Sequence, residues 1–293
     1  MSIRPRRSVL YMPGSNARAL EKAKTLDADA LILDLEDAVA PDAKEIARSQ
    51  VCEAVKAGGY GHRELVIRIN GLDTAWGRDD LAAAVDAAPD AILAPKVSSA
   101  SDIFTLTGHM GHAPRSIKLW AMMETPLGML NAGEVAATAK EGSARLSCFV
   151  MGTNDLAKET GARLDNGRRG MVGWLSICVA AACAHGLSII DGVYNDFKDE
   201  DGLIAECEHG RDFGMDGKTL IHPGQIAAAN CIFAPSEAEV ADARTVIEAF
   251  EQPENAGKGA INLNGRMVER MHADMAKRTV QLAEAISGRG GAA

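Results

Sequence analysis

The chain has 293 residues, of which 47% are hydrophobic and 24% charged, and its formal net charge is −9. This length and apolar content suit one large α/β domain with a short appendage, and they exclude a chain that is mostly disordered. The charge is spread without a block of Lys or Arg, and no apolar run approaches the roughly 20 residues that span a bilayer, so we expect neither nucleic acid nor a membrane as a partner.

Short apolar runs that end in polar or Gly/Pro residues recur along the chain, separated by segments of helix length. Runs that are apolar nearly throughout suit strands buried on both faces, and alternation with helices implies parallel pairing. Eight such units over residues 1–233 fit a closed (β/α)8 TIM barrel, which typically needs about 250 residues. The predicted strands cover residues 8–12, 30–35, 65–70, 91–96, 118–124, 147–152, 188–192 and 217–221.

A doubly wound open sheet is the rival architecture. It would require a glycine-rich dinucleotide turn after an early strand, and residues 12–16 (MPGSN) do not form one. The first predicted helix covers residues 17–26 instead, with Ser15 as the residue that caps it.

The pattern changes at residue 234. Residues 236–250 predict a helix, residues 260–268 a short hairpin, and residues 269–286 a last helix. An extension left over after barrel closure must bury its apolar face, so we expect residues 234–293 to pack on the barrel mouth or on a neighbouring subunit.

The N-terminal residues MSIRPRRSVLYMPG turn polar too soon for the apolar part of a signal peptide, so we expect a cytoplasmic protein. The cysteines contain no CxxC pair, which indicates reduced thiols rather than a zinc site or disulfides. They are Cys52, Cys148, Cys178, Cys183, Cys207 and Cys231.

Polar residues follow most of the predicted strands, and barrel active sites lie at the C-terminal ends of strands. Glu124 and Asp155 each follow a strongly apolar strand that should end deep in the barrel mouth. Carboxylates there need a compensating cation, and oxygen ligands completed by water suit Mg²⁺. A structural ion pair or a helix cap is the alternative for any one of these carboxylates. The strand-end residues are Asp34, Glu36, Asp37, Arg68, Asn70, Lys96, Glu124, Asn154, Asp155, Asp191 and His222.

Arg68 can hold a carbonyl or enolate oxygen while staying charged. Its alternative role is to pair with Glu36 or Asp37 and hold two strands together. Lys96 could likewise neutralise Asp34 or Glu36, and His222 could be a hydrogen-bonding residue at the rim.

Taken in order, these segments resemble the HpcH/HpaI aldolase superfamily, which includes citrate lyase β-subunits and malyl-CoA lyases. The short chain and the wording of WAMMET and MGTNDLAKE are most similar to the malyl-CoA group, especially its (3S)-malyl-CoA thioesterase branch. The matching segments are RRSVLYMPGSN, LILDLEDAVAPDAK, VIRINGLDT, AILAPKV, MMETPLGMLNA, MGTNDLAKE, IIDGVY, GMDGKTLIHPGQI and FAPSEAEV.

The resemblance implies a catalytic centre on a metal ion. Glu124 and Asp155 would ligate Mg²⁺, with Mn²⁺ as a possible substitute, and Arg68 would polarise the substrate oxygen near it. Glu36 and Asp37 would orient metal-bound water.

The resemblance also implies a CoA thioester as substrate. Tyr11 and Lys22 stand where relatives contact the nucleotide, and Asn16 replaces an arginine of the malyl-CoA group. Ile221 and His222 stand where relatives touch the ligand. The backbone amides of Asn154 and Asp155 would complete the grip on the substrate, because both residues open a helix.

One departure lies in the C-terminal extension. Related lyases carry an LDGR motif whose aspartate reaches from a neighbouring subunit to transfer a proton, whereas this chain has Asn264, and an amide does not transfer protons as a carboxylate does. Our main prediction is nevertheless a Mg²⁺-dependent lyase that cleaves or forms a C–C bond of malyl-CoA or β-methylmalyl-CoA. The alternatives are a (3S)-malyl-CoA thioesterase, a citrate lyase subunit acting on an acyl carrier, and a silent ligand-binding paralogue. The resemblance further implies a homotrimer or homohexamer.

Overall fold

A computed structural model describes residues 3–111 and 113–291 of the chain. The described residues fall into two compact units, Arg6–Phe233 and a second unit that joins the N-terminal residues up to Pro5 to the segment from Ala234 onward. Each unit is described by itself.

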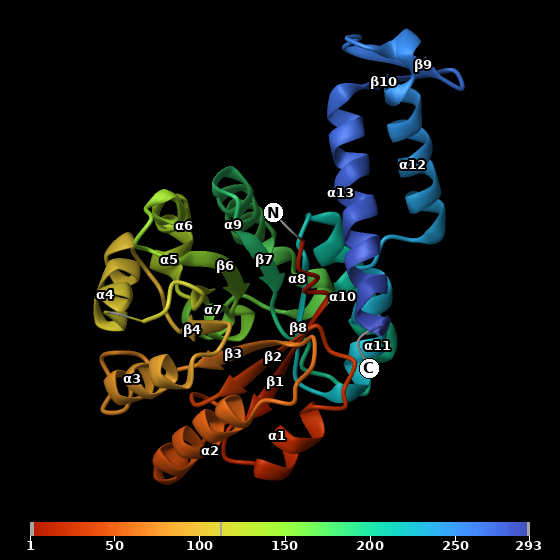
Figure 1. Cartoon of the computed structure of the whole chain (residues 1–293). Helices are drawn as coiled ribbons and strands as arrows, with labels where there is room; N and C mark the ends of the chain where they lie inside the picture. The colour runs from red at the N-terminus through yellow and green to blue at the C-terminus, as the bar shows by residue number, and fades with distance from the viewer. Residues whose placement is uncertain (1–2, 112, 292–293) are drawn as a thin grey trace. The chain divides into compact units, whose positions relative to one another are not determined.

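The first unit is a closed barrel of parallel strands, which confirms the predicted (β/α)8 fold (Figure 1). Each strand pairs with the next along the chain, and the last pairs with the first. The strands are β1 (Ser8–Pro13), β2 (Ala30–Asp34), β3 (Glu64–Arg68), β4 (Ala91–Ala94), β5 (Lys118–Met123), β6 (Leu146–Met151), β7 (Ser188–Asp191) and β8 (Gly217–Leu220).

Helices surround the strands and fill most of the connections between them (Figure 1). The α-helices are α1 (Ala17–Ala23), α2 (Lys44–Ala57), α3 (Gly77–Ala87), α4 (Ala100–Met110), α5 (Pro126–Leu130), α6 (Ala132–Ala137), α7 (Thr153–Thr160), α8 (Asp165–Arg168), α9 (Val172–His185), α10 (Glu200–Asp212) and α11 (Ile226–Ile232). Short 3₁₀ turns are η1 (Pro41–Ala43), η2 (Thr138–Lys140), η3 (Arg169–Met171) and η4 (Pro223–Gln225).

Alternate residues of each strand point to opposite sides of the barrel wall. The inward set forms one apolar cluster that includes Ile32, Val66 and Met122. The outward set, such as Leu31 and Ile67, packs against the helices in a second cluster. Every second residue of a strand faces the barrel interior, so a residue two positions after an inward one also faces inward. The polar residues at these strand ends therefore lie in the mouth.

Several boundaries differ from the predicted ones by one to three residues. Strand β3 ends at Arg68 and β4 at Ala94, so Asn70 and Lys96 lie in the loops beyond them. The first helix is capped by Asn16 rather than Ser15, because the Asn16 side chain accepts a hydrogen bond from the Ala19 N–H. Helix α1 then ends at Ala23.

The second unit is a pair of helices with a hairpin, α12 (Glu237–Glu251), β9 (Ala260–Leu263), β10 (Arg266–Glu269) and α13 (Arg270–Ser287), with short turns η5 (Pro253–Asn255) and η6 (Gly288–Gly291). The strands β9 and β10 pair antiparallel. Asn264 and Gly265 join them with φ values of 51° and 82°, the left-handed pair that a two-residue type I′ turn requires. Among the described residues, no helix is both long and apolar enough to cross a membrane.

Candidate active site

Arg68 and Asp34 form the anchor of the barrel mouth. Both side chains point inward, and the register of β2 and β3 places Asp34 directly beside Arg68. The guanidinium binds both carboxylate oxygens, with Nε and Nη2 each 2.6 Å from an oxygen of Asp34. Asp34 also accepts hydrogen bonds from the backbone N–H groups of Glu36 and Ala38, so it fixes the loop after β2 as well.

Arg68 binds two further carboxylates and one ring. Its Nη1 lies 2.8 Å from Glu36 and 3.3 Å from Asp37, and its guanidinium carbon lies 4.8 Å from the centre of the Tyr11 ring. Arg68 donates three hydrogen bonds to Asp34 and Asp37 and one to the sulfur of Met122, whereas its contact with Glu36 is an ion pair without hydrogen-bond geometry. Burial opposes its charge, but Tyr11, Asp34 and Glu36 outweigh that cost and hold the pKa of Arg68 above its ordinary value. The structural pairing that the sequence left open for Arg68 is therefore present.

Glu36 lies between two cations. Arg68 contacts one of its carboxylate oxygens, and the Lys96 Nζ lies 3.5 Å from the other. Burial nevertheless raises the pKa of Glu36 above its ordinary value, because Arg68 and Lys96 offset the cost of burial only in part. Of the two partners suggested for Lys96, the structure provides Glu36, whereas Asp34 is bound by Arg68.

Glu124 is the most deeply buried carboxylate of the predicted metal pair, with 1% of its surface exposed. Its Oε1 accepts a 2.7 Å hydrogen bond from the backbone N–H of Lys96. A Cβ at Gly152 would come within 2.5 Å of Oε2, so glycine leaves the space that this carboxylate occupies. Burial, followed by the negative charges of Glu36 and Asp155, raises the pKa of Glu124 to about 8.

Asp155 lies in the first turn of α7 and is half-buried. Its charge acts on both Glu124 and Lys96, so these three residues share one electrostatic environment. The first hydrogen bond of α7 runs from the Leu156 N–H to the Gly152 carbonyl, which leaves the preceding N–H groups of the turn available to an anion. Asp34, Glu36, Asp37, Arg68, Lys96, Glu124 and Asp155 together are called the mouth cluster below.

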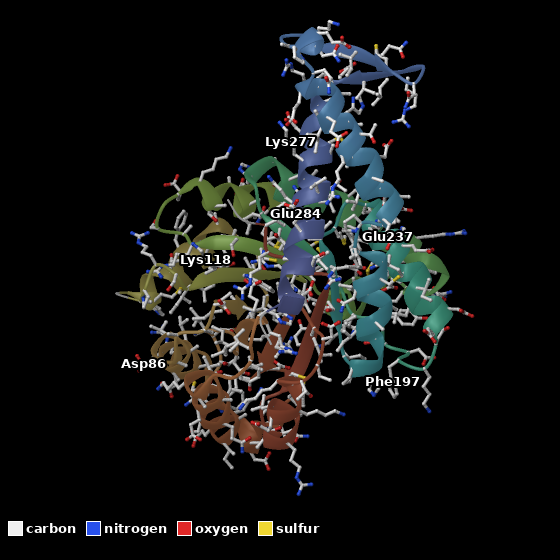
Figure 2. All side chains as sticks on the ribbon, turned by 45° about the vertical axis from the view of Figure 1, so that its right-hand side comes forward. Asp86, Lys118, Phe197, Glu237, Lys277 and Glu284 are labelled. Carbon is white, nitrogen blue, oxygen red and sulfur yellow. The ribbon has the colours of Figure 1, made fainter. Side chains whose placement is uncertain are left out.

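The loops after β6, β7 and β8 are joined to one another. Asn154 and Asn195 exchange two side-chain hydrogen bonds of 3.1 and 2.8 Å. His222 caps η4 through the Gly224 N–H and stacks on Phe197, with ring centres 4.9 Å apart; Figure 2 labels Phe197. Ile221 and His222 are exposed, as residues that touch a ligand would be.

Three other predicted site residues lie outside the mouth cluster. Asn16 is used as the cap of α1. Lys22 is exposed on the same helix. Asn264 belongs to the second unit, at the turn of its hairpin.

Lys44 is a buried residue of the site that the sequence analysis missed. Its Nζ donates to the carbonyl oxygens of Leu35 and Glu36 and to the side-chain oxygen of Asn70, at 2.7 to 2.8 Å. Burial lowers the pKa of Lys44, and the nearby charges of Asp34 and Glu36 offset this effect only in part. Lys44 thereby fixes the loop that carries Glu36. A lysine at the start of a helix is usually solvated, so its sequence position gave no signal.

Asp191 ends strand β7 but points away from the mouth. It follows the inward residue Ile190 by one position and faces the surrounding helices. There it binds Arg168 at 2.7 Å and Lys218 at 3.0 Å, and Lys218 also binds Glu206 at 2.6 Å. Burial alone would raise the pKa of Asp191, but Lys218 and Arg168 hold it below its ordinary value. Arg168, Asp191, Glu206 and Lys218 are called the outer network below.

The mouth cluster contains five carboxylates and two cations. Even with the neighbouring ammonium of Lys44, negative charge is in excess, and the donors are all oxygen atoms of the kind that bind Mg²⁺. No group of three or more His, Cys, Asp or Glu side chains suited to a metal ion is found within residues 3–111 and 113–291. A metal ion here would need water or substrate oxygens to complete its coordination.

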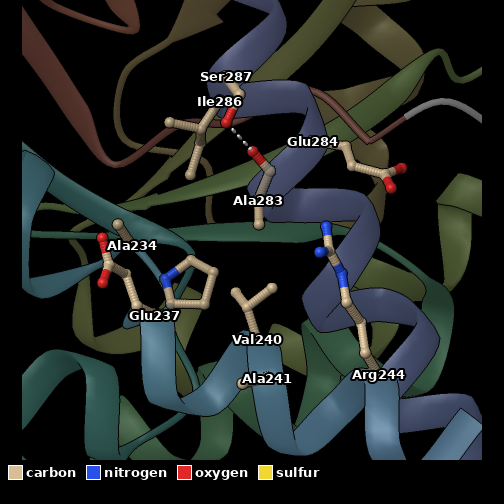
Figure 3. Close-up of a pocket in the computed structure, with 10 residues that line it drawn as sticks. Ala234, Glu237, Val240, Ala241, Arg244, Ala283, Glu284, Ile286 and Ser287 are labelled. Carbon is tan, nitrogen blue, oxygen red and sulfur yellow. Dashed lines mark hydrogen bonds between the residues drawn. The ribbon is translucent and has the colours of Figure 1, made fainter.

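A separate cavity of about 600 Å³ lies in the second unit, between α12 and α13 (Figure 3). Its walls are mostly apolar, with Arg244 at one end and Glu237 at the other. None of the predicted site residues lines it. The mouth cluster therefore stays the candidate active site.

Residues 7–223 match the family model described as HpcH/HpaI aldolase/citrate lyase. A (3S)-malyl-CoA thioesterase of Cereibacter sphaeroides (strain ATCC 17025 / ATH 2.4.3) is 53% identical over 98% of this chain and 97% of its own length. An L-malyl-CoA/beta-methylmalyl-CoA lyase of Cereibacter sphaeroides (strain ATCC 17029 / ATH 2.4.9) is 34% identical over 97% of this chain and 96% of its own length.

Among solved structures, the chain is similar to protein CitE from Mycobacterium tuberculosis in complex with magnesium, acetoacetate and coenzyme A. The two chains are 28% identical with a TM-score of 0.76, and the match covers 95% of this chain and 97% of that one.

These findings correct the main functional prediction. The C–C lyase was wrong, because relatives that are 53% to 54% identical over nearly the whole chain are thioesterases, whereas the lyase is far less similar. The amide at position 264 accords with this correction, since proton transfer to or from the acetyl-CoA fragment is a requirement of C–C cleavage and not of hydrolysis.

Proposed function

Because the chain belongs to the HpcH/HpaI aldolase/citrate lyase family, we propose that it is a Mg²⁺-dependent hydrolase that cleaves the thioester of (3S)-malyl-CoA. The observation that carries this proposal is the 53% identity with a (3S)-malyl-CoA thioesterase over 98% of the chain. The acidic mouth cluster supports it, because it supplies charged groups where a metal ion and a polar acyl group would meet.

The residues of the mouth fit a magnesium ion. Glu124 is buried beside the charges of Glu36 and Asp155, and its raised pKa marks a carboxylate whose charge is not yet compensated. Glu124 and Asp155 would hold Mg²⁺, which would supply positive charge to the carboxylate and hydroxyl oxygens of the malyl group. Because position 152 is glycine, no side chain there occupies the space of the second carboxylate oxygen of Glu124.

The other mouth residues would bind and orient the substrate. The free N–H groups of the first turn of α7, at Asn154 and Asp155, would accept the malyl carboxylate. Arg68 donates only three hydrogen bonds to carboxylates, and an N–H outside these would reach a substrate oxygen near the metal. Tyr11 and Lys22 would contact the CoA portion.

Hydrolysis requires a base for the attacking water. Glu36 is suited to this role because burial raises its pKa, and a carboxylate with a raised pKa accepts a proton more readily. The water oxygen bonds to the thioester carbon, the C–S bond breaks, and the proton taken by Glu36 passes to the departing sulfur. The products are malate and free CoA.

Incubation of the purified chain with (3S)-malyl-CoA and Mg²⁺ tests the proposal. We expect malate and free CoA thiol in equal amounts, no glyoxylate, and loss of turnover in EDTA. Glyoxylate with acetyl-CoA would contradict hydrolysis. Turnover that requires an acyl-carrier protein would favour a citrate lyase subunit, and absence of any turnover a silent paralogue.

The metal assignment is tested by Asp155→Asn with Glu159→Gln as a matched control, since Glu159 is exposed on the same helix. We expect Asp155→Asn to lower kcat/KM by about 10²- to 10³-fold, because loss of a Lewis acid costs several kcal/mol of transition-state stabilisation. Glu159→Gln should stay within twofold of the parent. Equal rates for the two variants, or turnover that survives chelation, would remove Asp155 from the metal site.

The homotrimer or homohexamer and the cytoplasmic location stay predictions.

A further inference from the structure

We propose that the ammonium group of Lys96 contacts the thioester carbonyl oxygen of the substrate and stabilises the oxyanion formed during its hydrolysis. This inference rests on the proposed function and adds to it a catalytic residue at the barrel mouth. From the sequence alone, Lys96 was also compatible with simple neutralisation of Glu36.

The backbone of Lys96 has an uncommon conformation. Its φ of 53° lies in the left-handed region, which residues other than glycine seldom adopt. In this conformation the backbone N–H of Lys96 donates to Glu124 at 2.7 Å. A strained backbone at a polar strand end is typical of functional sites. The same residue thus fixes the carboxylate of Glu124 and extends a cation over the mouth.

The cations of the mouth differ in how many hydrogen bonds they already donate. Arg68 donates three to carboxylates and one to a methionine sulfur, and Lys44 donates to three oxygen atoms in a buried position. The Lys96 side chain is 52% exposed, and its Nζ lies 3.5 Å from Glu36, beyond ordinary hydrogen-bond length. Lys96 therefore retains ammonium donors that have no hydrogen-bond acceptor among residues 3–111 and 113–291.

Neutralisation of Glu36 alone does not account for this placement. A half-exposed pair at 3.5 Å contributes little to stability, and Arg68 already binds Glu36 at 2.8 Å. A flexible side chain whose ammonium stands beside the proposed base is, however, well placed to meet the carbonyl oxygen of a thioester that the base-activated water attacks.

The step balances as an ordinary hydrolysis. The water oxygen forms a bond to the thioester carbon while one of its protons goes to Glu36, and the carbonyl oxygen becomes an oxyanion beside Lys96. The C–O double bond then re-forms, the C–S bond breaks, and the proton on Glu36 goes to the sulfur. Lys96 keeps its protons throughout and acts by charge.

The test compares the parent chain with Lys96→Met, Lys96→Arg and the control Lys158→Met, an exposed lysine of α7. All substitutions at position 96 keep the backbone N–H that binds Glu124. We expect Lys96→Met to lower kcat for (3S)-malyl-CoA by about 10²- to 10³-fold with KM changed less than threefold, as for loss of an oxyanion-hole donor. Lys96→Arg should recover at least a tenth of the parent kcat, and Lys158→Met should match the parent.

Two further measurements separate catalysis from positioning. Mg²⁺ should raise the thermal midpoint of Lys96→Met as it does that of the parent, and a thioether analogue of malyl-CoA, which lacks the carbonyl oxygen, should inhibit both equally. Lost stabilisation by Mg²⁺, or weaker binding of the thioether, would overturn the proposal in favour of positioning or of a contact elsewhere on the ligand. Parent-like kcat in Lys96→Met would overturn it while hydrolysis stands, whereas a parent chain that releases no malate would end both proposals.

Discussion

Two clusters of charge in the barrel, the outer network and the mouth cluster, differ in balance. The outer network pairs two carboxylates with two cations at 2.6 to 3.4 Å, and its arginine and lysine are almost fully buried. The mouth cluster sets five carboxylates against two cations. A buried pair that is fully matched serves the fold, whereas an excess of negative charge is costly unless a carboxylate takes up a proton or a further cation or ligand joins it. The balance of charge therefore indicates a structural role for the outer network and a binding role for the mouth cluster.

The backbone sharpens this contrast. Each cluster holds one cation in the left-handed region, Arg168 with φ of 57° and Lys96 with φ of 53°. The Arg168 side chain is 1% exposed and bound to Asp191, while the Lys96 side chain is 52% exposed and only loosely paired. The strained backbone of Arg168 belongs to a closed network of ion pairs, whereas that of Lys96 presents a cation to solvent.

The largest expected effect on stability comes from breaking the outer network. Lys218→Met should lower the free energy of unfolding by about 3 to 5 kcal/mol, because it leaves the buried carboxylates of Asp191 and Glu206 with Arg168 as the one remaining cation of the outer network. Urea titration measures the loss, with Lys158→Met as a control for removal of a solvated lysine. Hydrolysis per folded molecule should stay within threefold of the parent at low temperature. A loss below about 1 kcal/mol would contradict a structural role for the network.

The opposite result is expected in the mouth. Folding raises the pKa of Glu124 from 4.5 to about 8, so between these values the folded state holds a proton that the unfolded state has released. The stability of the metal-free chain should therefore fall as pH rises from about 4.5 through about 8. Glu124→Gln keeps the acceptor for the Lys96 N–H but removes this charge.

Unfolding in EDTA measures the difference between the two forms. At pH 8 we expect Glu124→Gln to be more stable than the parent by about 2 to 3 kcal/mol, with the gap closing towards pH 5. Added Mg²⁺ should stabilise the parent and leave the variant unchanged. A variant that is less stable than the parent at pH 8 would mean that Glu124 is already compensated by the protein alone.

Much of the fold follows from local sequence patterns. Apolar runs of strand length alternating with helix-length segments predict parallel strands buried on both faces, and eight such units without a glycine-rich dinucleotide turn favour the closed barrel over an open sheet. Strand ends were less certain, since a polar residue such as Glu36 or Lys96 can close a strand or begin the loop after it. The Asn264–Gly265 pair is the dipeptide of a two-residue hairpin turn, so its conformation agrees with a local rule.

The partners within the site did not follow from the sequence. Arg68 was expected to face Glu36 or Asp37, yet its strongest partner is Asp34, because the register of β2 and β3 sets these two residues side by side. Register between parallel strands depends on the helix that connects them, and no local pattern records it. Asp191 illustrates the same limit, because a shift of one residue along a strand turns a side chain from the mouth to the helices.

The smallest effect is expected at the exposed edge of the mouth cluster. Asp37 is 64% exposed and 3.3 Å from Arg68, so Asp37→Asn should change the free energy of unfolding by no more than about 1 kcal/mol. Its catalytic effect decides between the two carboxylates that could activate water. Since Glu36 is buried and has the raised pKa, Asp37→Asn should keep hydrolysis within threefold, while Glu36→Gln should lower kcat by about 10²- to 10⁴-fold. The reverse ranking would assign the base to Asp37, and Glu36 would then join Asp34 as a residue that positions Arg68.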